Sequence, residues 1–116
     1  MKDKILRVLK SIEYLSEVSF TSEILYNNKL YKLILDAKMT YKEIQITIKI
    51  CIPKDWDRNL IDIFVVNYTE IPYIPHIEKN GKICLFQLEG ILVEKDLIGI
   101  LCNCLQRMKE ILTNGI

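Results

Sequence analysis

The chain has 116 residues, 50% of them apolar, and 16 Lys and Arg residues balance 15 Asp and Glu residues to a net charge of +1. This length and composition are sufficient for one hydrophobic core without disulfide or metal support, so we expect a single domain over residues 1–116. The nearly neutral balance, with no basic stripe, argues against nucleic-acid binding.

The first part of the chain predicts a helix followed by extended segments. Apolar residues recur at helical spacing over residues 5–15, which predicts an amphipathic helix of about four turns. Residues 19–27 form a weaker extended segment that ends at the turn signal Asn27-Asn28. A period-2 pattern over residues 30–39 predicts a strand. Its expected core-facing side chains are Tyr31, Leu33, Leu35, Ala37 and Met39.

The clearest strand pattern comes next. Four isoleucines alternate with polar residues over residues 43–50, as expected of a strand with one face in water. Pro53 is expected to end this strand, because proline cannot donate to a β-ladder. The short apolar run over residues 61–66 predicts a more buried strand.

The last third of the chain predicts a long loop and a second helix. Pro72, Pro75 and the turn dipeptide Asn80-Gly81 interrupt residues 68–93. Long ordered loops in compact domains are often functional. Residues 95–113 predict an amphipathic helix with a stop signal at Asn114-Gly115. Its expected buried stripe is Leu97, Leu101, Leu105, Met108 and Leu112. The order of elements predicts an α+β fold: an N-terminal helix, a four-stranded antiparallel meander, a loop and a C-terminal helix.

The loop holds the candidate chemistry. His76 is the only histidine in the chain, and Cys84 follows it after the Asn80-Gly81 turn. Such a turn can fold the segment back and bring His76 within reach of Cys84. A thiolate is the reactive form of cysteine, and a neighbouring imidazole can lower the thiol pKa or transfer a proton.

Residues 74–85 resemble the active-site signature of the ubiquitin-conjugating enzyme family, which is His-Pro-Asn followed at a distance by Gly-x-Ile-Cys-Leu. The stretch Asn80-Gly81-Lys82-Ile83-Cys84-Leu85 matches the end of that signature, and Pro75 matches its proline. His76 stands where the family has asparagine, and Ile74 where it has histidine. This Pro-His pair is similar to divergent bacterial conjugating-like proteins of antiphage operons, including cyclic-oligonucleotide signalling systems. The family's order of elements agrees with the predicted order across nearly the whole chain.

The resemblance implies a ubiquitin-conjugating-like (UBC-like) fold and transthiolation. Cys84 would accept an activated C-terminal glycine as a thioester and pass it to an amine. His76 would either donate a hydrogen bond to the oxyanion or act as a base on the amine, and both roles stay open. The implied partners are a ubiquitin-activating-like enzyme and either a ubiquitin-like modifier or a nucleotidyltransferase C-terminus.

Two departures from the family limit what is carried over. The tryptophan and proline that usually follow the cysteine are replaced by residues 89–92, and one C-terminal helix stands where eukaryotic members have three. The acidic residue that some members use to activate lysine has two candidates here, Glu94 and Asp96.

Structural interpretations compete with the catalytic one. Cys84 can be read as a buried thiol and His76 as a loop histidine bonded to backbone, which would leave a non-catalytic UBC-fold binding module. A Cys–His hydrolase would need an orienting third residue, which the sequence does not indicate. Cys51, Cys102 and Cys104 are expected to fill the core, because a spacing of two on a helix does not suit a shared metal.

The remaining signals concern location and cofactors. Neither a secretory signal nor a run of roughly 18 apolar residues is present, which predicts a cytoplasmic protein with reduced thiols and no membrane partner. No phosphate-loop or dinucleotide fingerprint is present, so no cofactor is implied.

Overall fold

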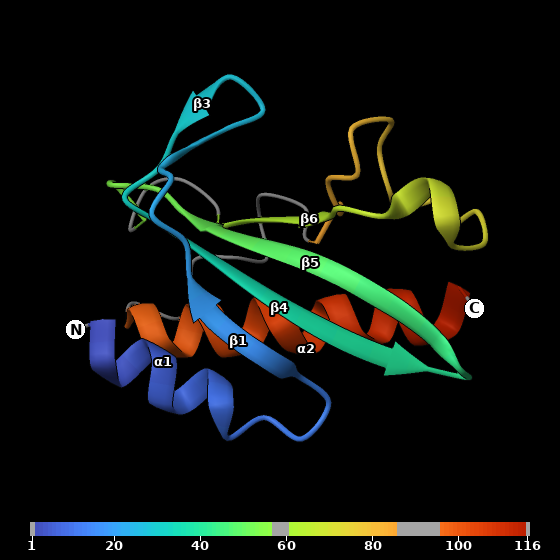
Figure 1. Cartoon of the computed structure of the whole chain (residues 1–116), viewed down its shortest axis with the longest axis horizontal. Coiled ribbons are helices and arrows are strands. Elements are labelled where there is room, and N and C mark those ends of the chain that lie inside the picture. The colour runs from blue at the N-terminus through green and yellow to red at the C-terminus, as the bar shows by residue number, and fades with distance from the viewer. Residues whose placement is uncertain (1, 57–60, 86–95, 116) are drawn as a thin grey trace.

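The computed structural model describes residues 2–56, 61–85 and 96–115. A short first helix precedes the strands, and a long helix ends the chain (Figure 1). The elements are α1 (Lys2–Lys10), β1 (Ser16–Phe20), β2 (Leu25–Tyr26), β3 (Lys29–Leu30), β4 (Leu33–Tyr41), β5 (Ile44–Ile52), β6 (Asp62–Val65), the 3-10 turn η1 (Tyr68–Glu70) and α2 (Leu97–Gly115).

The main sheet has four antiparallel strands in the order β1-β4-β5-β6. The longest pairing joins β4 to β5, from Leu33 opposite Ile52 to Tyr41 opposite Ile44. Between β1 and β4 the chain forms the small β2–β3 hairpin, turned by Asn27 and Asn28 at positive φ. These observations confirm the α+β class, the antiparallel meander between two helices, and the turn predicted at Asn27-Asn28.

Both helices pack on one face of the sheet (Figure 1). The isoleucine strand supplies the centre of this core, because Ile46, Ile48 and Ile50 are fully buried. β5 ends at Ile52, directly before Pro53, as predicted. The predicted apolar stripe of α2 is also confirmed, since all five of its residues are buried: Leu97, Leu101, Leu105, Met108 and Leu112.

A second, smaller core lies on the other face of the sheet, beneath the β2–β3 hairpin. It contains Ile34, Cys51 and Phe64, with Tyr26 packed edge-on against Phe64 at a ring-centroid distance of 4.8 Å. Tyr31 belongs to this cluster, so the prediction that it shares a face with Leu33 and Leu35 is wrong. The period-2 pattern is interrupted between β3 and β4, which changes the face on which Tyr31 lies.

The element boundaries differ from the predicted ones at both ends of the chain. α1 stops at Lys10, well before residue 15, because the Ser11 hydroxyl donates a 2.6 Å hydrogen bond to the Val8 carbonyl and the next backbone bonds are tight turns. β1 starts at Ser16, earlier than predicted. α2 continues to Gly115, past the predicted stop, and packs there against Ile74. Within the described ranges, neither helix is both long enough and apolar enough to cross a membrane.

Candidate active site

The candidate site is built on a hairpin formed by residues 76–84. Ile77 and Ile83 face each other in an antiparallel bridge, and the Glu78 amide donates to the Lys82 carbonyl at 2.8 Å. The Gly81 amide closes the turn with a 2.9 Å bond to the Glu78 carbonyl. The predicted Asn80-Gly81 turn is therefore confirmed.

Two further backbone bonds attach this hairpin to β6. The Val65 amide donates to the Gly81 carbonyl at 2.8 Å, and the Ile83 amide donates to the Ile63 carbonyl at 2.9 Å. Gly81 has φ of +88°, and a Cβ at this position would lie 2.4 Å from the Val65 carbonyl oxygen. Only glycine fits both the backbone conformation and the close approach. The sheet thus holds the hairpin through a residue that lies three positions before Cys84.

The hairpin brings His76 and Cys84 together. The Cys84 amide donates a 2.8 Å hydrogen bond to the His76 carbonyl, and both residues are exposed. On the opposite face of the hairpin Ile83 is buried and Ile77 is half-buried. The apolar pair anchors the hairpin on the core, and the thiol and the imidazole are left at the surface. The backbone bond thus pairs a residue with a thiol side chain and a residue with an imidazole side chain across the hairpin.

The other three thiols have different surroundings. Cys51 and Cys104 are buried, and desolvation raises the pKa of each thiol to about 12. Cys102 is exposed, so its predicted place in the core is wrong; on α2 it lies outside the buried stripe. Partial burial, and to a lesser degree Asp96, raise the pKa of Cys102. These shifts reduce the thiolate fraction at all three positions at neutral pH.

A buried carboxylate supports the hairpin from β6. Asp62 accepts a 2.6 Å hydrogen bond from the Tyr31 hydroxyl, and the ammonium groups of Lys29 and Lys82 each lie 3.4 Å from its oxygens. Desolvation, with this hydrogen bond as the next cause, raises the pKa of Tyr31. Sequence reasoning missed Asp62, although an aspartate inside a predicted buried strand was an available signal.

A cation on α2 holds the chain directly after the cysteine. The Arg107 side chain donates from Nε to the Leu85 carbonyl at 3.0 Å and pairs with Glu110 at 3.4 Å. This contact joins the candidate site to the C-terminal helix. Sequence reasoning also missed it, because no local pattern predicts a bond across 22 residues.

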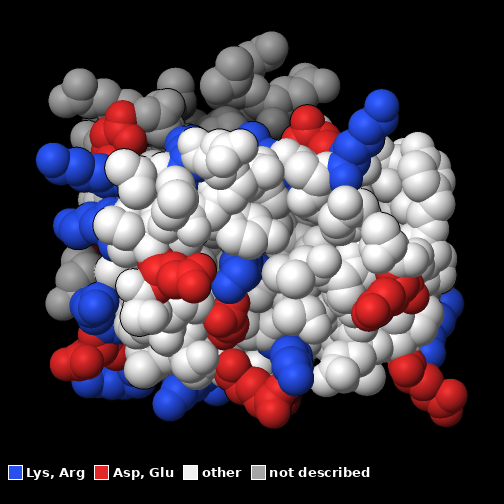
Figure 2. All heavy atoms as spheres, turned by 45° about the horizontal axis from the view of Figure 1, so that its top comes forward, with Lys and Arg blue, Asp and Glu red and all other residues white. Residues whose placement is uncertain are grey.

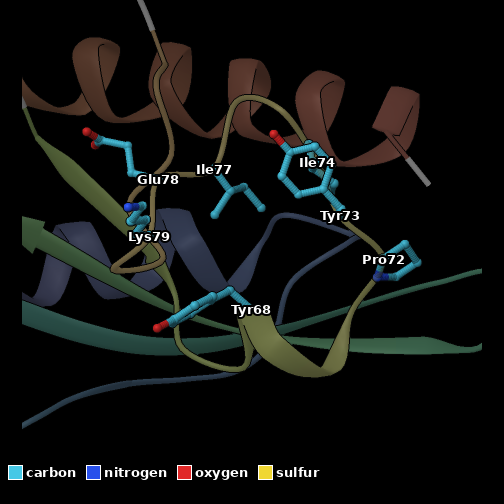
Figure 3. A pocket seen from close by; sticks show the side chains of 7 residues that line it. All are labelled: Tyr68, Pro72, Tyr73, Ile74, Ile77, Glu78 and Lys79. Carbon is cyan, nitrogen blue, oxygen red and sulfur yellow. The ribbon is translucent and has the colours of Figure 1, made fainter.

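An apolar cleft of about 470 Å³ lies beside the hairpin (Figure 3). Tyr68 and Ile77 face each other across it, and Tyr73 at its rim is 84% exposed. The full set of lining residues is Tyr68, Pro72, Tyr73, Ile74, Ile77, Glu78 and Lys79. Figure 2 shows acidic and basic side chains interspersed over one face of the molecule, with broad uncharged areas between them.

The two acidic candidates for lysine activation have different outcomes. Asp96 caps α2, because its carboxylate accepts a 3.3 Å hydrogen bond from the Gly99 amide. Glu94 and the residues that replace the family's tryptophan and proline lie outside the described residues. In the part of the chain that is described, no group of three or more His, Cys, Asp and Glu side chains is placed to hold a metal ion.

Comparison with known protein families gives a match over most of the chain. The model of prokaryotic E2 family B matches residues 18–116, which include the last three residues of β1, strands β2 to β6, the hairpin and α2. Neither the curated proteins nor the solved structures gave a match.

Proposed function

The chain belongs to prokaryotic E2 family B, and on this basis we propose that it is a ubiquitin-conjugating-like acyltransferase with a UBC-like fold. Cys84 accepts a ubiquitin-like modifier, or another activated C-terminal glycine, as a thioester and transfers it to an amine. The family match supports a conjugating-enzyme-like role, and the assignment to Cys84 depends on the geometry of the hairpin.

The reaction has two acyl-transfer steps. In the first, the Cys84 thiolate attacks the carbonyl carbon of the modifier's thioester on the activating enzyme, and the activating enzyme's thiolate leaves. In the second, a neutral amine attacks the new thioester, the Cys84 thiolate leaves, and the amine nitrogen loses a proton. The product is an amide, and Cys84 is ready for another cycle.

The observation that carries the proposal is the position of the Cys84 thiol. It is exposed, its backbone is hydrogen-bonded to that of His76, and the hairpin that carries it is fixed to β6. A modifier attached by its flexible C-terminus needs such an accessible sulfur. The buried sulfurs of Cys51 and Cys104 do not provide one.

His76 is the proposed partner of Cys84 in catalysis. As a hydrogen-bond donor it would stabilise the oxyanion that forms when either nucleophile attacks, and as a base it would take the proton from the incoming amine. Its exposed position beside Cys84 suits both roles.

The proposed partners rest on the family and on the resemblance of residues 74–85 to conjugating-like proteins of antiphage operons. They are an activating-like enzyme and either a ubiquitin-like modifier or the C-terminus of a nucleotidyltransferase, and they would act in a bacterial antiphage pathway. In this proposal residues 1–116 form a single conjugating domain in the cytoplasm, and ATP is consumed by the activating enzyme.

The test uses the purified chain with a candidate activating-like enzyme, a candidate ubiquitin-like modifier and ATP. We expect an adduct that thiol reductants remove, that is absent from Cys84→Ala and that persists in Cys102→Ser. Cys102→Ser is the matched control because Cys102 is the other exposed thiol among the described residues. An adduct that remains in Cys84→Ala would contradict the assignment to Cys84, whereas the absence of any adduct in the wild type would favour a non-catalytic binding module.

A further inference from the structure

Lys82 lies close to the proposed thioester. It precedes Cys84 by two residues in an extended segment, in which side chains two residues apart point to the same face. The backbone of Lys82 also forms an antiparallel β-bridge with Phe64. The Phe64 side chain belongs to the small core on the face of the sheet opposite the helices. The lysine and the cysteine are therefore neighbours on one face of the hairpin.

The ammonium group of Lys82 is held by Asp62. Lys82 Nζ lies 3.4 Å from Asp62 Oδ1, and the Asp62 side chain is 6% exposed, whereas the Lys82 side chain is 40% exposed. The Tyr31 hydroxyl and Lys29 bind the other carboxylate oxygen. Asp62 is thus a fixed anion that contacts groups from two segments of the chain, residues 29–31 and the hairpin.

We propose that Asp62 masks Lys82 and so prevents the enzyme from modifying itself. This inference rests on the proposed function, because it concerns the acyl group carried by Cys84. The ion pair holds the Lys82 nitrogen at Asp62 as an ammonium, which must leave the carboxylate and lose a proton before it has a lone pair for attack. Once released, Lys82 would lose one proton to solvent, and the neutral amine would attack the carbonyl carbon of the thioester. The C–S bond would break, and the Cys84 thiolate would leave as the nitrogen lost a second proton. Lys82 would then carry the acyl group as a stable amide, and the acyl group would be lost to the intended acceptor.

The experiment replaces the modifier with a small acyl donor, so that it depends on neither the activating enzyme nor the modifier. Phenyl thioacetate transfers its acetyl group to the Cys84 thiolate and releases thiophenol. After the excess reagent is removed, the acetyl group is followed by mass spectrometry of tryptic peptides. Transfer to Lys82 is detected directly, because trypsin does not cleave after an acetylated lysine.

We expect the acetyl group to move from Cys84 to Lys82 faster in Asp62→Asn than in the wild type, by up to about fivefold, the factor that loss of a partly exposed ion pair allows. Glu78 lies across the turn from Lys82 and can replace Asp62 as its partner. The shift is therefore expected to be larger in Asp62→Asn with Glu78→Gln. Adding Cys84→Ala to Asp62→Asn should abolish Lys82 acetylation. This control separates acetyl transfer from Cys84 to Lys82 from direct reaction of Lys82 with phenyl thioacetate.

The matched control is Glu17→Gln. It releases Lys38, whose side chain is 39% exposed and pairs with Glu17 at 3.0 Å on another part of the surface. Because Lys38 does not lie in the hairpin, its release should leave the rate of acetyl loss from Cys84 unchanged. A rate in Asp62→Asn equal to that in the wild type would overturn the proposal, and so would failure of Cys84 to accept the acetyl group.

A second measurement uses the wild-type protein alone, in case Asp62→Asn does not fold. Trace labelling with acetic anhydride compares Lys82 with Lys38, since their side chains are equally exposed. We expect Lys82 to react at least about twofold more slowly, because its partner is buried and fixed. Equal labelling of Lys82 and Lys38 would overturn the proposal that Asp62 masks Lys82. If the modifier adduct never forms but the acetyl shift occurs, the proposed function fails and the masking of Lys82 stands.

Discussion

The Cys84 amide donates a 2.8 Å hydrogen bond to the His76 carbonyl, so the only histidine of the chain and an exposed thiol are neighbours across one hairpin. Four positions of the hairpin or its flank contact other elements: Gly81 and Ile83 contact β6, Lys82 contacts Asp62, and Leu85 contacts α2. The geometry of the candidate site is therefore set by the sheet and the last helix together.

The four thiols should differ in reactivity. We expect iodoacetamide to label Cys84 first and Cys102 more slowly, and to leave Cys51 and Cys104 unlabelled until the protein unfolds. With a thiol pKa of about 12, the last two are almost entirely protonated at pH 7.5, and both are buried. Peptide mapping of the alkylated protein over time measures the order. Labelling of all four at one slow rate would contradict an active-site role for Cys84.

Replacing Gly81 should damage the hairpin. In Gly81→Ala the added Cβ would meet the Val65 carbonyl at 2.4 Å, and alanine at φ of +88° is strained. We expect the free energy of unfolding in urea to fall by about 1–3 kcal/mol and Cys84 alkylation to change as the hairpin shifts.

Gly115→Ala is the matched control for this substitution. Its added Cβ would meet only the side chain of Ile74, at 2.9 Å, in the last turn of α2. A smaller loss of stability is expected there, with Cys84 alkylation unchanged. Equal effects of the two substitutions would show that the turn geometry does not govern the thiol.

Removing the Tyr31 hydroxyl should change how stability depends on pH. Burial and the Asp62 hydrogen bond raise the pKa of Tyr31 above its unfolded value of about 10. The phenol is therefore neutral in the folded protein where the unfolded chain would ionise, and its contribution is fully present below pH 10 and decreases above it. We expect Tyr31→Phe to lower the free energy of unfolding by about 1–3 kcal/mol at pH 7.

The same variant should also lose stability less steeply than the wild type between pH 9.5 and 11, because the titrating phenol is gone. Urea unfolding at several pH values measures both effects. Tyr41→Phe is a suitable control, since Tyr41 is only partly buried and lies at the far end of β4. If the free energy of unfolding of Tyr31→Phe depends on pH as that of the wild type does, the role given to the hydroxyl is contradicted.

Substitutions of His76 should separate its two proposed roles. His76→Ala is expected to slow discharge of the Cys84 thioester to an amine by about 100-fold, within the usual range for loss of a proton-transfer group. His76→Asn keeps a hydrogen-bond donor and should restore most of the rate if His76 stabilises the oxyanion. If His76 is a base, His76→Asn should be as slow as His76→Ala, because asparagine cannot accept the proton.

These rates are measured in single-turnover discharge of the preformed thioester, with lysine as the acceptor. An undiminished rate in both variants would exclude His76 from the reaction.

Sequence periodicity predicted the parts of the fold in which the spacing of apolar residues within one segment determines which side chains are buried. The isoleucine alternation of β5 and the buried stripe of α2 are of this kind, because burial of one face requires the pattern. The pattern failed where local bonds or breaks override it. At the end of α1, the Ser11 hydroxyl donates to the Val8 carbonyl. Before β4, the interruption of the strand pattern places Tyr31 on the face of the sheet opposite the helices.

The candidate site was predictable in part for a related reason. The turn at Asn80-Gly81 follows from residue type, and it accounts for the position of His76 beside Cys84. The contacts of Asp62 and Arg107 join segments that are far apart in sequence, so no spacing rule indicates them. The catalytic roles of Cys84 and His76 stay predictions.

The most direct test of the central claim is intact-mass spectrometry of the chain after incubation with its activating enzyme, modifier and ATP. The account predicts a mass increase of one modifier less one water that disappears with dithiothreitol, maps to Cys84, and is present in Cys102→Ser but absent from Cys84→Ala. A modifier adduct of the same yield in Cys84→Ala, or one mapped to another thiol, would contradict the account.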